Sequence, residues 1–243
     1  MKRYNISYND QRIDYEITHR PAVTRRIHLE VGGQGDLRVV APRRMSRRAI
    51  QKALQQRAHY VSRFLDRARE RQRDLPELHY VNAEEHLFMG SRYPLEVLLQ
   101  RGQRESVGLV DQRIRVPAPE LTRDRVSKCL QQWYRRQAQQ HFGKRLAAHS
   151  RAAPWTAGQT PTMRLRRMKR TWGSCSSKGV ITLNPQLIKA PRHCIDYVIA
   201  HEICHLKEHN HGKAFYALQE QLFPGWREAK TQLADRGHIF LHM

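Results

Sequence analysis

Two histidines enclose a glutamate in the segment His201-Glu-Ile-Cys-His205. Residues four apart lie on one face of a helix, so both imidazole rings can reach one zinc ion while Glu202 lies beside a water molecule on that ion. The spacing therefore predicts a hydrolytic centre in which Glu202 is the general acid/base. The same pattern also arises by chance, so the residues around it have to support this interpretation.

A third ligand is required, because catalytic zinc is typically held by three protein side chains with one position left open. Asn210 and Gly212 favour a helix end or a turn, which would let His211 fold back toward the metal. Glu220, on the next expected helix, is the gluzincin-like alternative. The remaining candidates are less favoured on spacing: His209, His238 and His242.

The motif is expected in the second half of a buried helix over about 191–209. Pro191 is suited to the first turn of such a helix. Three apolar residues upstream of the motif recur at helical spacing: Ile195, Val198 and Ile199. This stripe predicts that one face of the helix packs into a core and fixes the histidines.

Residues 179–184 are bounded by Gly179 and Pro185 and contain β-branched side chains, a pattern typical of a short strand. A strand beside the metal helix is expected to offer its edge to an extended peptide substrate. From about residue 121 onward the expected order is helix, strand, strand, metal helix, helix. This order is that of a minimal zincin core.

Four segments carry a resemblance to a known family: Trp172-Gly-Ser-Cys-Ser, Ile181-Thr-Leu-Asn, Ile195-Asp-Tyr-Val-Ile-Ala-His-Glu-Ile-Cys-His-Leu and Asn210-His-Gly-Lys-Ala-Phe. In these segments the chain resembles the YgjP-like metallopeptidases, small zincins related to the SprT and WLM groups. The match is close over about 162–230, and the layout of the earlier elements is also similar. The resemblance implies that His201, His205 and His211 bind zinc and that Glu202 is the general acid/base.

The first part of the chain shows strand patterns. Apolar residues alternate on both sides of Asn9-Asp10 and again on both sides of residues 32–36, which predicts two hairpins. Ser46 is suited to cap a long helix over about 47–72 that covers the resulting antiparallel sheet.

Strand patterns return over residues 86–117, and Thr122 is suited to cap another long helix. We therefore predict an α+β fold with a boundary near residue 120. Residues 1–120 would form an antiparallel β-rich half with one long covering helix, and residues 121–243 a gluzincin-like catalytic half.

The chain has 243 residues, of which 40% are hydrophobic, and this is enough to form a substantial core. No apolar run in the sequence resembles a signal peptide or reaches the length of a membrane span. The four cysteines form no C-x-x-C pair: Cys129, Cys175, Cys194 and Cys204. We expect a cytoplasmic protein with reduced thiols and no membrane partner.

Basic residues outnumber acidic ones by 44 to 22, which gives a formal charge of +22. The excess lies in the two long helices and the approach to Trp172: residues 1–75 contain 18 basic and eight acidic residues, and residues 121–171 contain 13 and one. A surface of this kind attracts nucleic acid, nucleotide phosphates or acidic protein. The competing explanation is a compositional preference for arginine. We expect a polyanion as a partner of the basic helices.

The leading hypothesis is a metallopeptidase that holds one zinc ion per chain and cleaves a peptide or protein substrate. Tyr216, one turn beyond His211, is the first candidate to stabilise the developing oxyanion, and Tyr197 is the second.

An alternative hypothesis is a metal-dependent nucleotide phosphohydrolase, a pyrophosphatase. Lys169, Arg170 or Lys178 would then hold the phosphates. A weaker alternative is a protease associated with nucleic acid, because the basic helices would bring it to a bound protein.

Overall fold

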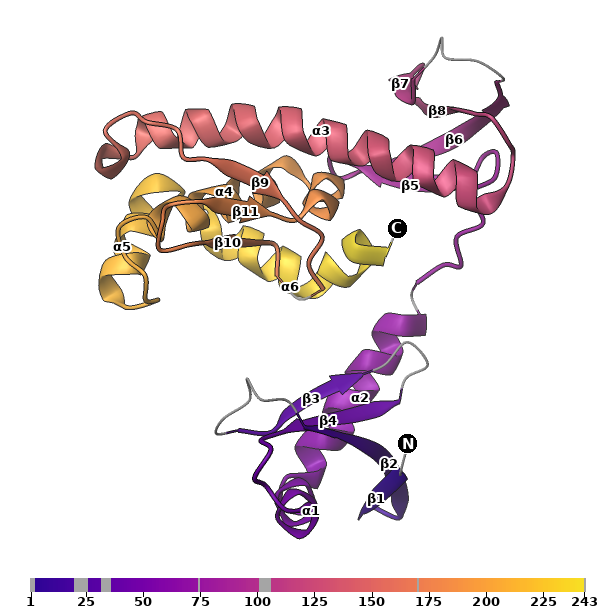
Figure 1. Ribbon diagram of the computed structural model, residues 1–243, viewed down its shortest axis with the longest axis vertical. Helices are drawn as coiled ribbons and strands as arrows, with labels where there is room; N and C mark the ends of the chain where they lie inside the picture. The colour runs from indigo at the N-terminus through magenta and orange to yellow at the C-terminus, as the bar shows by residue number, and fades with distance from the viewer. Residues whose placement is uncertain are drawn as a thin grey trace. The chain divides into compact units, whose positions relative to one another are not determined.

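The computed structural model describes residues 3–19, 26–31, 36–73, 75–100, 106–169 and 171–242 (Figure 1). The chain divides into two compact units, Met1–Pro76 and Glu77–Met243. Both contain strands and helices, so the predicted α+β class is confirmed. None of the helices in the described ranges combines the length and the apolar character that a membrane crossing requires.

The first unit contains a four-stranded sheet with the order β1-β2-β4-β3. Its strands are β1 (Arg3–Tyr8), β2 (Gln11–His19), β3 (His28–Val31) and β4 (Leu37–Ala41). The two predicted antiparallel pairs, β1 with β2 and β3 with β4, are present. However, β2 and β4 pair in parallel, so the sheet is mixed rather than antiparallel. Most of the second predicted turn, residues 32–35, lies outside the described residues.

Two helices cover this sheet where the sequence predicted one: α1 (Arg47–Gln56) and α2 (Ala58–Arg73). As predicted, Ser46 caps the first, since its hydroxyl accepts a hydrogen bond of 3.3 Å from the Ala49 amide. Arg57 interrupts the helix with non-helical backbone angles. Apolar residues of both helices and of the sheet form one core, which includes Ile6, Tyr15, Val39, Ile50, Leu54, Val61 and Leu65.

The second unit begins with a sheet of order β5-β6-β8-β7. Its strands are β5 (Glu85–Phe88), β6 (Ser91–Leu99), β7 (Gly108–Val110) and β8 (Arg113–Ala118). They pack on α3 (Arg123–Ala152): the rings of Phe88 and Trp133 are 4.8 Å apart, and Tyr134 donates a 2.7 Å hydrogen bond to the Leu87 carbonyl. Because these strands share a core with the following helices, the boundary lies after Pro76 and not near residue 120.

A second, three-stranded sheet lies beside α3. Its order is β10-β11-β9, from β9 (Met163–Leu165), β10 (Gly173–Cys175) and β11 (Ile181–Leu183). The strand expected over 179–184 is β11, but it is central and pairs with β10 on one side and β9 on the other. The expectation that this strand offers its edge to a substrate is therefore wrong. The sheet's edges are β9 and β10.

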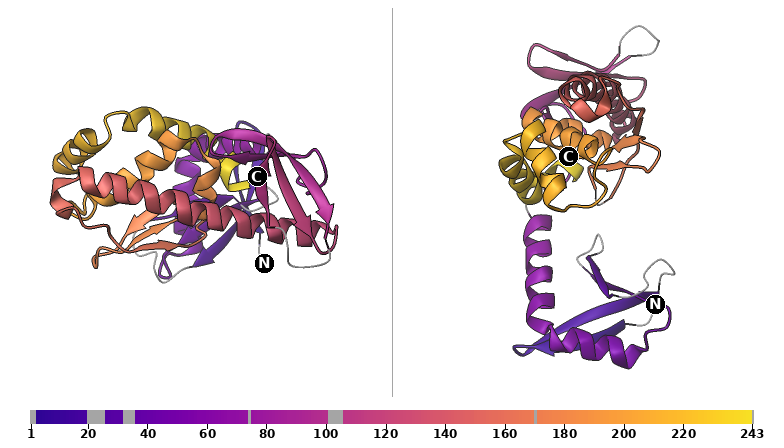
Figure 2. Two further views of the ribbon diagram at one scale, coloured as in Figure 1. Left: turned by 90° about the horizontal axis from the view of Figure 1, so that it is seen from above. Right: turned by 90° about the vertical axis from the view of Figure 1, so that its left-hand side faces the viewer.

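The remaining helices are α4 (Arg192–Cys204), α5 (Lys213–Leu222) and α6 (Trp226–His242), with the short 3₁₀ helices η1 (Pro154–Thr156) and η2 (Pro185–Lys189). Figure 2 shows from two more directions that α3 runs past both the β5–β8 sheet and this helical part. The helix predicted over about 191–209, which carries His201 and Glu202, is α4. It ends at Cys204, five residues before the predicted end at residue 209. Apolar side chains of α3, β11, α4 and α6 form the core beneath it.

Asp196 ties α4 to α3. Its two carboxylate oxygens accept hydrogen bonds of 2.5 and 2.9 Å from Arg145, and His149 Nε2 lies 3.3 Å from one of them. Burial by itself would raise the pKa of Asp196, but His149 and Arg145 outweigh burial and hold the pKa below its usual value. The carboxylate therefore stabilises the packing of the metal helix.

We expect Asp196→Asn to lower the free energy of unfolding by roughly 1.5–3 kcal/mol, because a charged hydrogen bond is lost. Since the folded-state pKa is lowered, the stabilisation is complete above the unfolded pKa of roughly 3.9 and is lost as the pH falls through the folded value. Urea titrations at neutral and acidic pH measure both effects. The exposed Asp235→Asn is the control, and an equal loss in both variants would contradict the assignment.

Candidate metal centre

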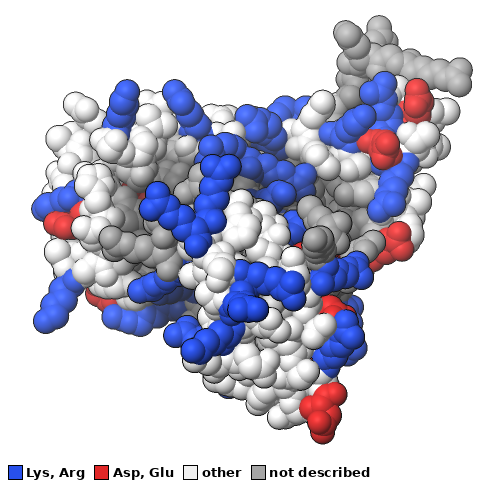
Figure 3. All heavy atoms as spheres, turned by 60° about the horizontal axis from the view of Figure 1, so that its bottom comes forward, with Lys and Arg blue, Asp and Glu red and all other residues white. Residues whose placement is uncertain are grey.

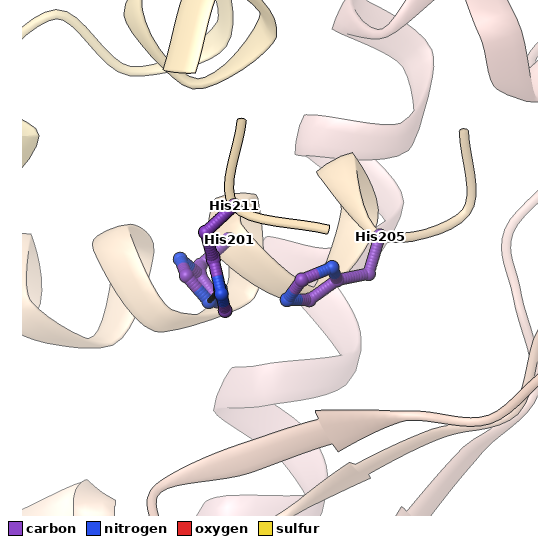
Figure 4. A group of neighbouring side chains, drawn as sticks. All are labelled: His201, His205 and His211. Carbon is purple, nitrogen blue, oxygen red and sulfur yellow. Dashed lines mark hydrogen bonds between the residues drawn. The ribbon is translucent and has the colours of Figure 1, made fainter. Parts of the chain in front are cut away.

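Three histidine rings converge at the end of α4. His201 lies in the last turn of α4, His205 follows its last residue, and His211 lies in the loop before α5. One nitrogen of each ring lies within 4.8 Å of the others, and the Nε2 atoms of His201 and His211 are 3.0 Å apart. Figure 4 shows the His205 ring pointing toward the other two. The structure thus brings together the three predicted ligands.

Local backbone contacts produce this convergence. The Gly212 amide donates a 2.8 Å hydrogen bond to the Asn210 carbonyl, which forms the tight turn that returns His211 to the helix. His205 Nδ1 donates a hydrogen bond of 3.0 Å to the Glu208 carbonyl, so Nδ1 keeps its proton and Nε2 carries the free lone pair. This partner fixes both the tautomer and the ring orientation, as is usual for a metal ligand.

Phe215 holds all three rings from the α5 side. It is fully buried, and its ring centroid lies 4.8 Å from that of His201, 4.6 Å from His205 and 4.7 Å from His211. No role for Phe215 was predicted from the sequence. Its position four residues after His211, on the helix that follows, is the signal that could have identified it.

The histidines are suited to bind a cation. Burial lowers the pKa of His201 to about 4, and the neighbouring His205 and His211 add to this effect. The ring is therefore neutral at pH 7, with a lone pair available for a metal. The fully buried Gln219 side chain partly opposes this lowering of the His201 pKa. Its effect is weak, because neither polar atom of the Gln219 side chain has a hydrogen-bond partner among the described residues.

Glu202 is only 4% exposed, and its Oε2 atom has no hydrogen-bond partner among the described residues. Burial raises its pKa to about 8. A buried carboxyl without a partner is costly unless a cation or a water molecule satisfies it. Together with the three converging imidazole rings, this unsatisfied oxygen fits a site built for a metal ion and a water molecule.

Gly173, on β10, leaves the space that Glu202 occupies. A Cβ atom at this position would lie 2.5 Å from Oε1 and 2.8 Å from Cγ of Glu202. The buried Asn184 fixes the adjoining segment. Its backbone amide donates a 2.8 Å hydrogen bond to the Trp172 carbonyl, and its side-chain Nδ2 donates one of 2.8 Å to the Met168 carbonyl. In the sequence, Gly173 stands out only as part of the Trp172-Gly-Ser-Cys-Ser motif. Its absent side chain is a requirement of the site.

Both predicted tyrosines lie beside the histidines. The Tyr216 ring is 6.4 Å from that of His211 and stacks on Trp226 at 5.2 Å. The Tyr197 ring is 5.8 Å from that of His201. Burial, followed by the neighbouring Tyr216 and Glu202, raises the pKa of Tyr197 to about 12, so its hydroxyl keeps its proton and can donate it in a hydrogen bond.

The other candidates lie outside this group. Glu220 is exposed and accepts hydrogen bonds from Trp226 at 2.8 Å and Arg227 at 2.5 Å. The alternative histidines are likewise not among the three that converge: His209, His238 and His242. Of the basic residues considered for phosphates, Lys169 and Lys178 are exposed, and Arg170 lies outside the described residues.

Comparisons with known proteins assign the family. The sequence model of the YgjP-like metallopeptidase domain matches residues 25–236. The solved structure of the metallopeptidase zymogen abylysin from Pyrococcus abyssi is 29% identical over 36% of this chain and 88% of that chain, with a TM-score of 0.33. The comparison with curated proteins gave no match. Because the family match spans most of the sequence, the chain belongs to the YgjP-like metallopeptidases, a family of metal-dependent hydrolases.

Proposed function

We propose that the protein is a zinc metallopeptidase in which His201, His205 and His211 hold one zinc ion and Glu202 is the general acid/base. The convergence of three imidazole nitrogens within 4.8 Å carries this proposal. Three nitrogen ligands with one open position are typical of catalytic zinc. The buried, unpartnered carboxyl of Glu202 supplies the acid/base that a hydrolase needs.

When bound, zinc would lower the pKa of a water molecule and polarise the scissile carbonyl. Glu202 takes the proton from the attacking water and returns it to the leaving amine. Burial raises the pKa of this carboxyl to about 8, and a cation bound beside it would favour the carboxylate form that accepts the proton. Tyr216 or Tyr197 donates a hydrogen bond to the oxyanion.

The β10 strand is the proposed substrate edge. It pairs with β11 on one side only, and its Gly173 lies against the Glu202 side chain. An extended peptide that pairs with the other side of β10 would pass beside the general acid/base. The substrate-binding edge that was predicted for β11 is therefore assigned to its neighbour β10 in this proposal.

Substituting His211→Ala should sharply reduce the zinc retained after dialysis, because two ligands hold the ion poorly. Elemental analysis of the wild-type protein should find about one zinc per chain. The matched control is His209→Ala, an exposed histidine two residues away, which should retain its zinc. Full retention by His211→Ala would refute the ligand set.

Nucleotide phosphohydrolysis is the second candidate, supported by the excess of 44 basic over 22 acidic residues. Zinc-loaded protein should be assayed against an unfolded polypeptide, with and without DNA, and against nucleoside triphosphates. We expect cleavage of the polypeptide. Triphosphate hydrolysis alone would establish the alternative, and cleavage only with DNA would establish a nucleic-acid-associated protease.

A further inference from the structure

One exposed face of α3 carries a line of long polar side chains. They recur every three or four residues, which places them on one side of the helix. All are exposed, and four of the six are cationic: Arg125, Lys128, Gln132, Arg135, Arg136 and Gln139. We call this set the basic stripe. At the rise of an α-helix it extends over about 20 Å.

A shallow groove of about 380 Å³ runs along the end of the basic stripe. Its lining consists of Gln132, Arg135, Arg136, Gln139 and, from β9, Leu165. Arg135 donates a 3.3 Å hydrogen bond to the Leu165 carbonyl, which holds the helix and the strand together. On either side of this contact the strand region adds two exposed cations, Arg164 and Arg166.

The cations of the basic stripe differ from the paired arginine on the same helix. Across the residues that the structure describes, no ion pair joins them to a carboxylate, whereas Arg145, on the same helix, binds Asp196. Apart from the stripe, Lys and Arg also prevail over Asp and Glu in the space-filling view of Figure 3. Unpaired cations in a row produce a positive potential that attracts a polyanion.

A general preference for arginine does not explain this distribution. Residues 76–120 belong almost entirely to the same compact unit and contain five basic and seven acidic residues, whereas residues 121–171 contain 13 and one. Within the second unit the excess is therefore local to α3 and the adjoining β9 region, while residues 1–75 carry a separate excess of 18 basic over eight acidic residues. A local, aligned and unpaired set of cations is what a binding surface requires.

We propose that the basic stripe and the groove beside β9 bind the phosphate backbone of a nucleic acid. Arginine, lysine and glutamine side chains are typical donors to phosphate oxygens. A protein partner fits less well, because the centres of protein interfaces are rich in aromatic and apolar side chains and Leu165 is the only apolar residue in the groove lining. This proposal does not depend on the peptidase mechanism.

The test compares two triple variants of the full-length protein by fluorescence anisotropy. Labelled duplex DNA and single-stranded RNA serve as probes over a range of salt concentrations. One variant neutralises the surface with Lys128→Gln, Arg135→Gln and Arg136→Gln. The control removes the same charge from exposed positions of the first unit, with Lys52→Gln, Arg63→Gln and Arg67→Gln.

Each phosphate contact contributes roughly 0.7–0.9 to the slope of log affinity against log salt. The stripe variant should therefore lose roughly 2–3 from the slope and bind at least tenfold more weakly at a fixed low salt concentration, while the control keeps the wild-type slope. Zinc content and the melting temperature should match the wild type. If the triple variant is poorly folded, Lys128→Gln and Arg136→Gln alone should each reduce the slope by about one.

Three outcomes would overturn the proposal. Absence of binding at low salt would show that the surface has no nucleic-acid role. Equal losses in the two triple variants would show that total charge, and not this surface, causes binding. Equal competition by polyglutamate of matched charge would indicate an acidic polypeptide as the partner. A preference for DNA or for RNA would identify the type of nucleic acid.

Discussion

Zinc-loaded Glu202→Gln should retain its metal and its fold but lose hydrolytic rate by about 10²–10⁴, the usual contribution of general acid/base catalysis. The glutamine keeps the size of the side chain but cannot accept the proton of the attacking water. Glu202 is 4% exposed, and its Oε2 atom has no hydrogen-bond partner among the described residues, so the substitution breaks no hydrogen bond of that oxygen that holds the fold. The measurements are kcat on a polypeptide substrate and zinc per chain.

Glu220→Gln is the matched control, because this exposed glutamate was the alternative ligand and is bound to Trp226 and Arg227. It should keep both activity and zinc. Undiminished activity in Glu202→Gln would show that the zincin mechanism is wrong for this protein and that the metal is structural. Loss of zinc from Glu220→Gln would return the third-ligand assignment to that residue.

Adding one methyl group at Gly173 should also be damaging. In Gly173→Ala the new Cβ would lie 2.5 Å from Glu202 Oε1, so the carboxyl has to move. A displacement of about 1 Å at a catalytic group can reduce the rate by roughly 10²-fold. We expect kcat to fall by about that factor, with zinc content unchanged, because the histidines are positioned by α4 and Phe215.

Gly143→Ala is the control, since a Cβ there meets no atom within 4 Å. The double variant Gly173→Ala, Glu202→Gln separates an effect through Glu202 from general damage. If Gly173 acts by positioning Glu202, its substitution should cost little further activity once the carboxyl is gone. Additive losses in the double variant would contradict this role.

The spacing of the His201–His205 motif predicted correctly those features of the structure that depend on local geometry. The four-residue interval of His201 and His205 places them on one side of a helix whatever surrounds it. The turn residues Asn210 and Gly212 likewise act locally and bring His211 back. By the same logic Ser46 identified the start of α1, since a cap needs only the next three residues.

Features that depend on distant residues were not predictable in this way. The β9 and β10 strands have three residues each, which is too few to show the periodicity of a strand. The central position of β11 between them could therefore not be predicted from the sequence. The need for glycine at position 173 arises from a side chain 29 positions later, at Glu202. The division after Pro76 depends on the burial of Phe88 and its neighbours against α3.

The contact of Phe215 with the rings of all three proposed metal ligands has a thermodynamic consequence. Its ring is 0% exposed and touches every proposed ligand, so unfolding that exposes Phe215 also disperses the ligands. An ion that binds only the folded chain stabilises it by RT ln(1 + [L]/Kd), which is about 2.7 kcal/mol at a hundredfold excess of free ion over Kd. Zinc bound at the proposed site would therefore raise the melting temperature of the second unit as the free zinc concentration rises.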